Sequence, residues 1–303
     1  MTAAELIAAS RRWLNDENSQ TYKWTVAELV DYYNAAMDEV ARETDYFTDP
    51  STVAATTIAI TAGTPDYAYH ATALDILSAR LSDSSKNLTR ASRGDLNINV
   101  PTWRYLNSVY GTDISFATGS IASTSTDFNE SGFASDAFVL ISGAGESANN
   151  KTVKLSAVAE NLLTLASGYT LTTEAAGQAV VLQELNTGTP DYYLTDYRTG
   201  YITLYPAPDA NGTLHVDITR LQSTLLTEAT VSSLAIPLHY QYHLGLVNGI
   251  LYYAYLKSGP STFNIEKSNV HRGNFAMLKD RIKKDMIKMR GASTIIAPHF
   301  GNT

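Results

Sequence analysis

Segment 236–256, IPLHYQYHLGLVNGILYYAYL, decides the fold, because its start signal, its hydrophobic pattern and its stop signal agree. Pro237 stands where a helix can begin, and Ser258-Gly259-Pro260 stands where a helix cannot continue. Apolar residues occur on nearly every side of the expected helix, which is typical of a helix that several neighbours bury. The segment is long enough to cross a bilayer, but its two histidines, Gln241 and Asn248 favour a protein environment over lipid.

The composition indicates a folded protein without disulfides. The 303 residues are 44% hydrophobic and 17% charged, which is typical of globular chains with a buried core. The formal net charge of −8 opposes general attraction to nucleic-acid phosphates, so nucleic-acid binding would need a local basic patch. The absence of cysteine excludes thiolate metal sites and fits folding in a reducing cytoplasm. Residues 1–24 lack the apolar core of a signal peptide, so we expect neither secretion nor membrane anchoring.

Two further helices are expected near the N-terminus. Segments 2–14 and 25–44 both begin with Thr-x-x-Glu, the spacing of a capping box, and each continues with an apolar stripe. Trp24 precedes the second box at the position of a hydrophobic staple. Because neither 25–44 nor 236–256 can bury its stripe alone, we expect these two helices to pack together.

The middle of the chain has the residue pattern of β-structure. Residues 56–61, Thr-Thr-Ile-Ala-Ile-Thr, are β-branched or small and are expected to be extended, whereas 71–93 fit a helix and a hairpin equally well. Four short apolar runs between Gly or Asn turns are expected strands, at 138–141, 152–155, 162–165 and 179–182. Since segment 119–186 has no helical period, it is predicted to be an inserted small β-barrel or sandwich domain.

A last helix completes the predicted α+β fold class. It is expected to begin near Thr262 or Asn269 and to end near Met289, with an inner face of Val270, Leu278, Ile282, Met286 and Met289. The N- and C-terminal helices would form a helical bundle joined to a β-rich part. The predicted domains are a discontinuous core of residues 1–118 and 187–303 and the inserted all-β domain of residues 119–186.

Six short motifs stand in a characteristic order and spacing. They are Trp24-Thr-x-x-Glu-Leu, Asn34-Ala35 with Glu39, Pro101-Thr-Trp103, Pro190-Asp-Tyr-Tyr193, Leu204-Tyr-Pro-Ala-Pro-Asp209 and Ile236-Pro237. Together with the closing helices they resemble the head-to-tail adaptor proteins of tailed bacteriophages, also described as connector or tubular tail protein A-like proteins. The resemblance covers residues 1–118 and 187–290. Segment 119–186 resembles β modules inserted in other phage structural proteins and departs from the plain adaptor pattern.

The resemblance implies a ring, usually of twelve copies, at the head–tail junction of the virion. The ring would assemble in the host cytoplasm, dock beneath the portal protein and contact tail or nozzle proteins, and DNA would pass through it without sequence-specific binding. The charge pattern is compatible with a ring, because residues 1–47 carry nine acidic and four basic residues whereas 279–290 carry six basic and two acidic residues. Opposite charges on different segments suit head-to-tail packing of identical subunits.

Residues that could support catalysis or metal binding do not form a convincing pattern. His239 and His243 have the i, i+4 spacing of zinc ligands, but the sequence between them lacks the glutamate base of zinc enzymes, and the chain has no cysteine. A glycosidase needs two carboxylates at one site, and nothing in the sequence brings together any two of Glu160, Glu174, Glu184, Asp191 and Asp196. Neither a G-x-S-x-G elbow nor a P-loop is present. We therefore expect no enzyme activity and no catalytic, cofactor-binding or metal-binding residue.

Two sets of residues are expected to contact other proteins. The resemblance places the portal at the last helix and the tail, with candidate contacts Lys279, Lys283, Lys284, Ile295, Ile296 and Phe300. The basic run 279–290 is expected on the outer face of an amphipathic helix, which favours contact with protein or solvent over contact with DNA phosphates. Neighbouring subunits would meet at tyrosine-rich flanks of the helices, with candidate contacts Tyr32, Tyr33, Tyr252 and Tyr253.

The leading hypothesis is a structural virion protein, a head-to-tail adaptor ring that extends the DNA channel of the portal and provides the attachment site of the tail. The alternative, from a different class, is a receptor-binding or adhesin-like virion protein whose β insertion binds a glycan through its Tyr and Phe side chains. The tail beyond Gly291 either frays or docks onto a partner by strand addition or pocket insertion.

Overall fold

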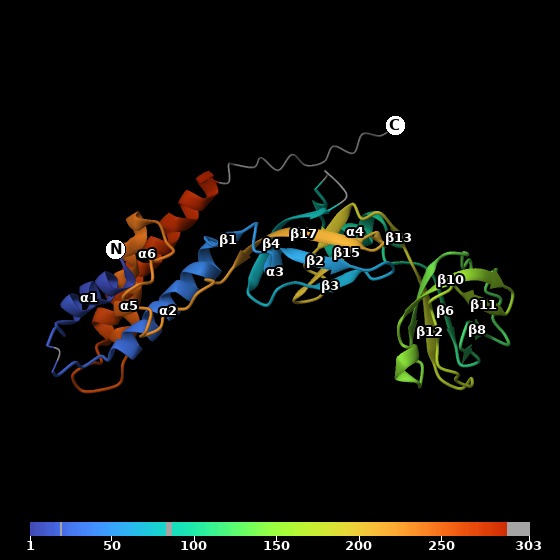
Figure 1. The fold of residues 1–303 in the computed structure, drawn as a ribbon, viewed down its shortest axis with the longest axis horizontal. Coiled ribbons are helices and arrows are strands. Elements are labelled where there is room, and N and C mark those ends of the chain that lie inside the picture. The colour runs from blue at the N-terminus through green and yellow to red at the C-terminus, as the bar shows by residue number, and fades with distance from the viewer. Residues whose placement is uncertain (19, 83–86, 290–303) are drawn as a thin grey trace. The chain divides into compact units, whose positions relative to one another are not determined.

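The computed structural model describes residues 1–18, 20–82 and 87–289, which form two compact units. Unit 1 comprises Met1–Asp49, Thr72–Leu74 and the chain from Thr219 onward, and unit 2 comprises Pro50–Ala71 and Asp75–Ile218. The fold is mixed α+β, with 30% helix, 29% strand and open sheets, so the predicted α+β class is confirmed at this level. Figure 1 shows the order of the elements along the chain.

Unit 1 is mainly helical. Its elements are α1 (Ala3–Leu14), α2 (Val26–Thr44), the short strand β1 (Thr48–Asp49), the 3-10 helix η2 (Tyr240–Tyr242), α5 (His243–Ala254) and α6 (Ile265–Met289). Both predicted capping boxes are present, between Thr2 and Glu5 and between Thr25 and Glu28. α1 and α2 therefore begin and end where the sequence predicts.

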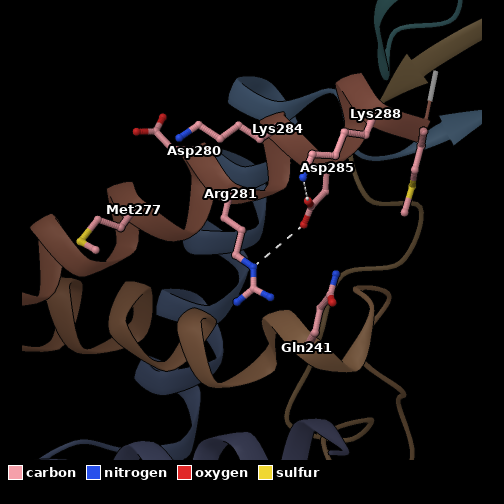
Figure 2. A pocket seen from close by; sticks show the side chains of 8 residues that line it. Gln241, Met277, Asp280, Arg281, Lys284, Asp285 and Lys288 are labelled. Carbon is pink, nitrogen blue, oxygen red and sulfur yellow. Dashed lines mark ion pairs between the residues drawn. The ribbon is translucent and has the colours of Figure 1, made fainter. Parts of the chain in front are cut away.

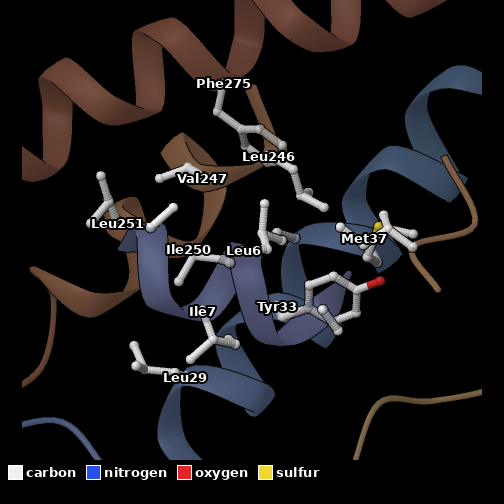
Figure 3. Close-up of a cluster of buried hydrophobic side chains, with 14 of the residues drawn as sticks. Leu6, Ile7, Leu29, Tyr33, Met37, Leu246, Val247, Ile250, Leu251 and Phe275 are labelled. Atoms are coloured by element: carbon white, nitrogen blue, oxygen red, sulfur yellow. The ribbon is translucent and has the colours of Figure 1, made fainter. Parts of the chain in front are cut away.

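Helix α5 is the centre of the core of unit 1. It packs against α1, α2 and α6, and these four helices lie side by side in Figure 1. Figure 3 shows how Leu246 and Ile250 of α5 meet Leu6 of α1, Met37 of α2 and other side chains of the cluster. Burial of one large aliphatic or aromatic side chain stabilises a fold by about 1.5–3 kcal/mol, so a cluster of this size is a major source of stability for unit 1.

Two glycines one turn apart allow the neighbouring helices to approach α5 closely. A Cβ atom added at Gly249 would lie 2.8 Å from the Cβ of Ala36 on α2 and 3.0 Å from a ring carbon of Phe275 on α6. A Cβ atom added at Gly245 would lie 2.6 Å from a methyl carbon of Leu278 on α6. The spacing between these helices therefore depends on the absence of side chains at both positions.

The prediction of a continuous helix over 236–256 is wrong at its N-terminal end. Only η2 and α5 are helical, and Ile236 and Leu238 are buried in non-helical backbone. This part of the chain is fixed by tertiary contacts, since the backbone N–H of Ala3 donates to the Leu234 carbonyl and that of His239 donates to the Tyr46 hydroxyl. These contacts override the helical preference of the sequence.

The inner face of the last helix is only partly as predicted. Leu278 and Ile282 are buried, but Val270 and Met289 are largely exposed. The buried face instead includes Ser268, Phe275 and Lys279. The physical reason is that docking against α2 and α5 sets the rotation of α6, and this rotation brings a lysine inward where an opposing carboxylate can pair with it.

Unit 2 is built from short strands in several sheets. Strands β3 (Asp66–Ala68), β15 (Tyr201–Tyr205), β14 (Tyr192–Leu194) and β5 (Thr89–Arg90) form one sheet in that order, and β13 (Thr187–Gly188) pairs in parallel with β16 (Ala207–Pro208). Strand β17 (Gly212–Arg220) pairs with β2 (Thr57–Ile60) and with β4 (Ala73–Leu81). The short helices are α3 (Val53–Thr56), α4 (Arg93–Asn99) and the 3-10 helix η1 (Ser147–Asn149). The predicted extended segment 56–61 is thus confirmed at β2, and β4 resolves the ambiguity in 71–93 in favour of a strand.

A seven-stranded sheet forms the largest part of unit 2. Its order is β6 (Tyr105–Gly111), β12 (Val180–Leu185), β9 (Phe138–Ser142), β10 (Thr152–Ala159), β11 (Leu162–Leu165), β8 (Ser120–Ala122) and β7 (Ser115–Ala117). The four predicted strands are confirmed as β9, β10, β11 and β12. Strands β6 and β7 belong to the same sheet although they precede residue 119, where the predicted insertion begins.

We predict that substitution of a buried glycine on α5 and of an exposed glycine on α6 changes the free energy of unfolding in opposite directions. Gly249→Val should lower the free energy of unfolding by about 1–3 kcal/mol, because the new methyl groups overlap α2 and α6. Gly273→Ala on α6 should raise it by about 0.5–1 kcal/mol, because a Cβ there meets nothing within 4 Å and alanine favours a helix. Urea denaturation followed by far-UV circular dichroism measures both changes, and equal effects of the two substitutions would contradict the close packing.

Candidate functional site

The exposed face of α6 is the candidate functional site. Buried side chains occupy one face of this helix, and the opposite face carries exposed residues at helical spacing. One row of exposed residues along this face is apolar or small in its N-terminal half, with Val270, Gly273 and Met277. The same row is basic in its C-terminal half, with Arg281, Lys284 and Lys288. An exposed helix face of mixed apolar and cationic character is suited to contact with another macromolecule.

A groove of about 740 Å³ lies along the basic half of this face (Figure 2). Its lining residues come from α6 and η2: Gln241, Met277, Asp280, Arg281, Lys284, Asp285, Lys288 and Met289. Met277 and Met289 are 71% and 72% exposed. Because a thioether side chain is flexible and polarisable, these methionines can adapt to the shape of an apolar partner residue.

The groove contains one hydrogen-bonded carboxylate, that of Asp285, and two mostly exposed cations, Arg281 and Lys288. Asp285 accepts a hydrogen bond from the Tyr242 hydroxyl at 2.9 Å and lies 4.0 Å from the Arg281 Nε and 3.7 Å from the Lys288 Nζ. Burial and the neighbouring Asp285 carboxylate raise the pKa of Tyr242, so this phenol keeps its proton. Arg281 and Lys288 are mostly exposed, and surface ion pairs of this kind are weak, so both cations remain available to an external carboxylate.

Lys279 lies on the other side of α6 and has a different environment. It is 8% exposed, and its Nζ lies 2.7 Å from Glu39 and 2.6 Å from Glu43 of α2. Burial by itself would lower the pKa of Lys279, but hydrogen bonds and charge from the two glutamates outweigh it, so the pKa is raised. Tyr253 of α5 donates a hydrogen bond to Glu39 as well. The predicted contact residue Lys279 thus joins α6 to α2 within the subunit.

The four predicted tyrosine contacts fall into two environments. Tyr33 is fully buried in the helical core, where burial raises its pKa to about 12. Tyr32, Tyr252 and Tyr253 are only half-buried, and the Tyr32 and Tyr253 rings stack with centroids 6.3 Å apart. The structure therefore brings three of the four together at the junction of α2 and α5, beside the Glu39–Lys279 ion pair.

Of the remaining predicted portal contacts, two lie in the described part of the chain and three lie outside it. Lys283 and Lys284 are exposed on α6, and Lys284 lines the groove. Ile295, Ile296 and Phe300 lie outside the described residues. The groove also contains Arg281, Lys288, Met277 and Met289, which the sequence analysis did not name as contacts; it had placed Met289 on the buried face. The spacing of four, three and four residues between Met277, Arg281, Lys284 and Lys288 was the available signal, but it could be used only once the buried face was known.

Of the residues considered for chemistry, His243 and Glu174 have structural contacts. His243 is buried with its Nε2 2.8 Å from the Leu238 carbonyl. Glu174 accepts hydrogen bonds from the backbone of Gly145 and Glu146 and from Asn149, and these bonds outweigh desolvation and lower its pKa. Within the described ranges no three His, Asp or Glu side chains are arranged as metal ligands would be. In the same part of the chain no helix is both long and apolar enough to cross a bilayer.

The aromatic residues of the seven-stranded sheet are mostly internal. Phe116, Phe128, Phe133 and Phe138 are buried, so they cannot stack on a sugar ring from solution. Tyr110 on β6 is the large aromatic side chain that the described part of this sheet leaves strongly exposed. Glycan binding through the phenylalanines, part of the alternative hypothesis, therefore has no surface in this conformation.

The mixed α+β fold and the exposed, partly cationic face of α6 are compatible with a protein that binds other proteins. A family model described as SU10 adaptor protein matches residues 1–128 and 150–296. The chain belongs to this family of phage adaptor proteins. Most of the predicted insertion 119–186 lies within the match, and residues 129–149 between the matched ranges include β9. Comparison with curated proteins gave no match.

We predict that Lys279→Met lowers the free energy of unfolding by about 1–3 kcal/mol at neutral pH, because Glu39 and Glu43 lose their shared cation, and partial exposure of the glutamates limits the loss. The folded-state pKa of Lys279 is raised, so its contribution is complete below the ordinary lysine pKa of about 10.4 and disappears as the pH rises through the folded-state value. Denaturation from neutral to strongly alkaline pH should therefore show the two proteins converging.

Lys283→Met is the matched control, because Lys283 is exposed on the same helix. Its effect should stay within about 0.5 kcal/mol at every pH. A constant difference between wild type and Lys279→Met across the alkaline range would show that the ion pairs do not carry the stabilisation.

Proposed function

We propose that this protein forms a ring beneath the portal of a tailed phage, extends the DNA channel and provides the site where the tail attaches. Membership of the phage adaptor family supports a structural role in the virion. The observation that carries the proposal is the face of α6 that stays exposed among the described residues, which combines exposed methionines with three cations. In this proposal the protein acts by contact with other proteins and not by catalysis, and DNA passes without sequence-specific binding.

The portal contact is assigned to the C-terminal part of α6 and the residues after it. Arg281, Lys284 and Lys288 would meet acidic portal residues while Met277 and Met289 cover apolar ones. Lys283 would contribute from the adjacent side of the helix. Ile295, Ile296 and Phe300 stay in the proposal as apolar contacts of the tail. Lys279 would act indirectly, by fixing the position of α6 on α2.

The contact between neighbouring subunits is assigned to the tyrosine cluster of Tyr32, Tyr252 and Tyr253. Half-buried tyrosines are well suited to an interface, because a rigid ring adds contact area at little entropic cost and its hydroxyl stays hydrogen-bonded. The opposite charges of α2 and α6 add complementarity between successive subunits of a closed ring. Tyr33, which is fully buried, would support this surface from within the core.

The finer domain assignments belong to the same proposal. The four packed helices of unit 1 would act as a helical bundle at the portal side, in a core formed by residues 1–118 and 187–303. Segment 119–186 would be an inserted β domain directed to tail or nozzle proteins. The apolar cluster around β9 to β12 is separate from that of unit 1 and supports a distinct β body, but it includes Val109, Ile114 and Phe116, so this body would begin before residue 119.

Electron microscopy of the purified protein, alone and mixed with the portal protein of the same phage, tests the proposal. The expected result is a ring, for which the family resemblance gives twelve copies, bound coaxially to the portal. Absence of a ring under both conditions, combined with unchanged portal binding after deletion of residues 291–303, would reject the proposed arrangement.

We predict that reversing the charges of the groove weakens portal binding without unfolding the protein. The triple variant Arg281→Glu, Lys284→Glu and Lys288→Glu should reduce affinity by at least tenfold, which corresponds to about 1.4 kcal/mol. Its thermal unfolding midpoint should change little, because all three side chains are exposed.

Lys151→Glu, at an exposed position in unit 2, controls for the effect of a single charge reversal and should leave affinity unchanged. Sedimentation or surface plasmon resonance with immobilised portal gives both affinities. Equal affinities of wild type and the triple variant would remove the groove from the portal contact.

A further inference from the structure

The seven-stranded sheet of unit 2 has one covered edge and one open edge. At the covered edge, Phe116 of β7 exchanges two backbone hydrogen bonds with Glu174, of 2.9 and 3.0 Å, and Leu171 donates to the Thr118 carbonyl at 2.9 Å. At the other end, β6 pairs with β12 and, among the described residues, with no other strand. Every second residue of β6 therefore directs its backbone N–H and C=O groups away from the sheet.

The sequence of β6 lacks the features that usually prevent an edge from pairing. Natural edge strands are protected by lysine, proline, inward-pointing charges or short length. The seven residues of β6, Tyr-Leu-Asn-Ser-Val-Tyr-Gly, include no charge and no proline. Seven residues span roughly 23 Å at 3.3 Å per residue, which is enough for a ladder of several hydrogen bonds. The register shift against β12 lies between Gln183 and Leu185, so β6 keeps a regular register from Ser108 to Gly111.

Along this edge, one face of β6 carries two exposed apolar side chains on either side of exposed Ser108. Leu106 and Tyr110 share that face and are 46% and 68% exposed, whereas Val109 on the opposite face is buried in the core. Across the ladder, Tyr110 is paired with Val181, which is half-buried. A strand added beside β6 would cover Leu106 and Tyr110 with its own residues at alternate positions.

We propose that β6 is an acceptor edge for a strand from another protein of the assembled particle. The segment that fits is extended, uncharged and apolar at alternate residues. The backbone N–H and C=O groups on the edge of β6 that no described strand pairs can be satisfied by an extended chain. Because β6 carries no charged side chain, it cannot form an ion pair with a charged segment. Leu106 and Tyr110 require apolar residues four positions apart on one face, with the residue between them opposite Ser108.

The geometry favours a different protein over a second copy of this chain. Head-to-tail continuation of the sheet around a ring would need β6 of one subunit to pair with the far edge of the next sheet, and segment 171–174 already covers that edge. Pairing of β6 with β6 of another copy is a two-fold contact, which closes at two subunits. The acceptor edge thus adds a partner contact that is independent of the portal contact on α6.

Photo-crosslinking in assembled particles tests this proposal. A photoreactive amino acid is placed separately at 106, 108 and 110 of the full chain, which is expressed in infected cells so that it enters particles. The matched control position is Leu162, which is 41% exposed but lies on β11, a strand paired on both sides. The expected adducts join 106, 108 and 110 to one extended, uncharged segment of another virion protein, with the attachment point moving along that segment in step with the position on β6.

Adducts to a second copy of this chain would overturn the proposal, as would the same adduct from position 162 or the absence of any adduct from 106–110. Tyr110→Lys should reduce the adduct formed from position 108 at least tenfold, and Leu162→Lys should leave it unchanged, with equal unfolding midpoints for both variants. An unchanged adduct yield in Tyr110→Lys would exclude strand pairing. The triple charge reversal on α6 should not alter this adduct, so failure here and failure of the portal contact are distinguishable.

Discussion

The close packing of α5 against three other helices is the constraint on which unit 1 depends. Gly245 and Gly249 have no side chain where α6 and α2 approach, and the space they leave is filled by Leu278, Phe275 and Ala36. Because the contacts are this close, α6 can dock in one rotation only. Trp24 adds a further link at the C-terminal end of α5, where its indole N–H donates to the Ala254 carbonyl at 3.0 Å.

The rotation of α6 in turn determines which surface the protein presents. With Phe275 and Ile282 inward, Lys279 is brought against Glu39 and Glu43, where its charge is neutralised within the subunit. Arg281, Lys284 and Lys288 of the same basic run then project outward beside exposed methionines. One helix therefore separates its charges into a set that holds the fold together and a set that remains available to a partner.

In unit 2, residues that stabilise the fold and groups that remain accessible to a partner are likewise separated, here between the faces and edges of the seven-stranded sheet. Phe116, Phe128 and Phe138, which could have formed a binding surface, are buried in the core. What remains accessible is the backbone of β6 with Leu106 and Tyr110 beside it. Interaction capacity in this unit thus lies in unpaired hydrogen-bonding groups more than in side-chain chemistry.

The sequence by itself determined the features that depend on neighbours along the chain. Capping boxes at Thr2 and Thr25 fixed the starts of α1 and α2, and short apolar runs between Gly or Asn turns fixed the central strands, because these signals are local. The tertiary structure alone decided the features that depend on distant residues. Residues 236–239 are non-helical because this part of the chain is held by hydrogen bonds between His239 and Tyr46 and between Leu234 and Ala3. Lys279 faces inward because it pairs with Glu39 and Glu43, which lie 240 and 236 positions away in the sequence. The tertiary structure also decides which edge of the seven-stranded sheet is open. Segment 171–174 covers the edge at β7, whereas no described strand covers the edge at β6, and no local sequence pattern encodes this difference.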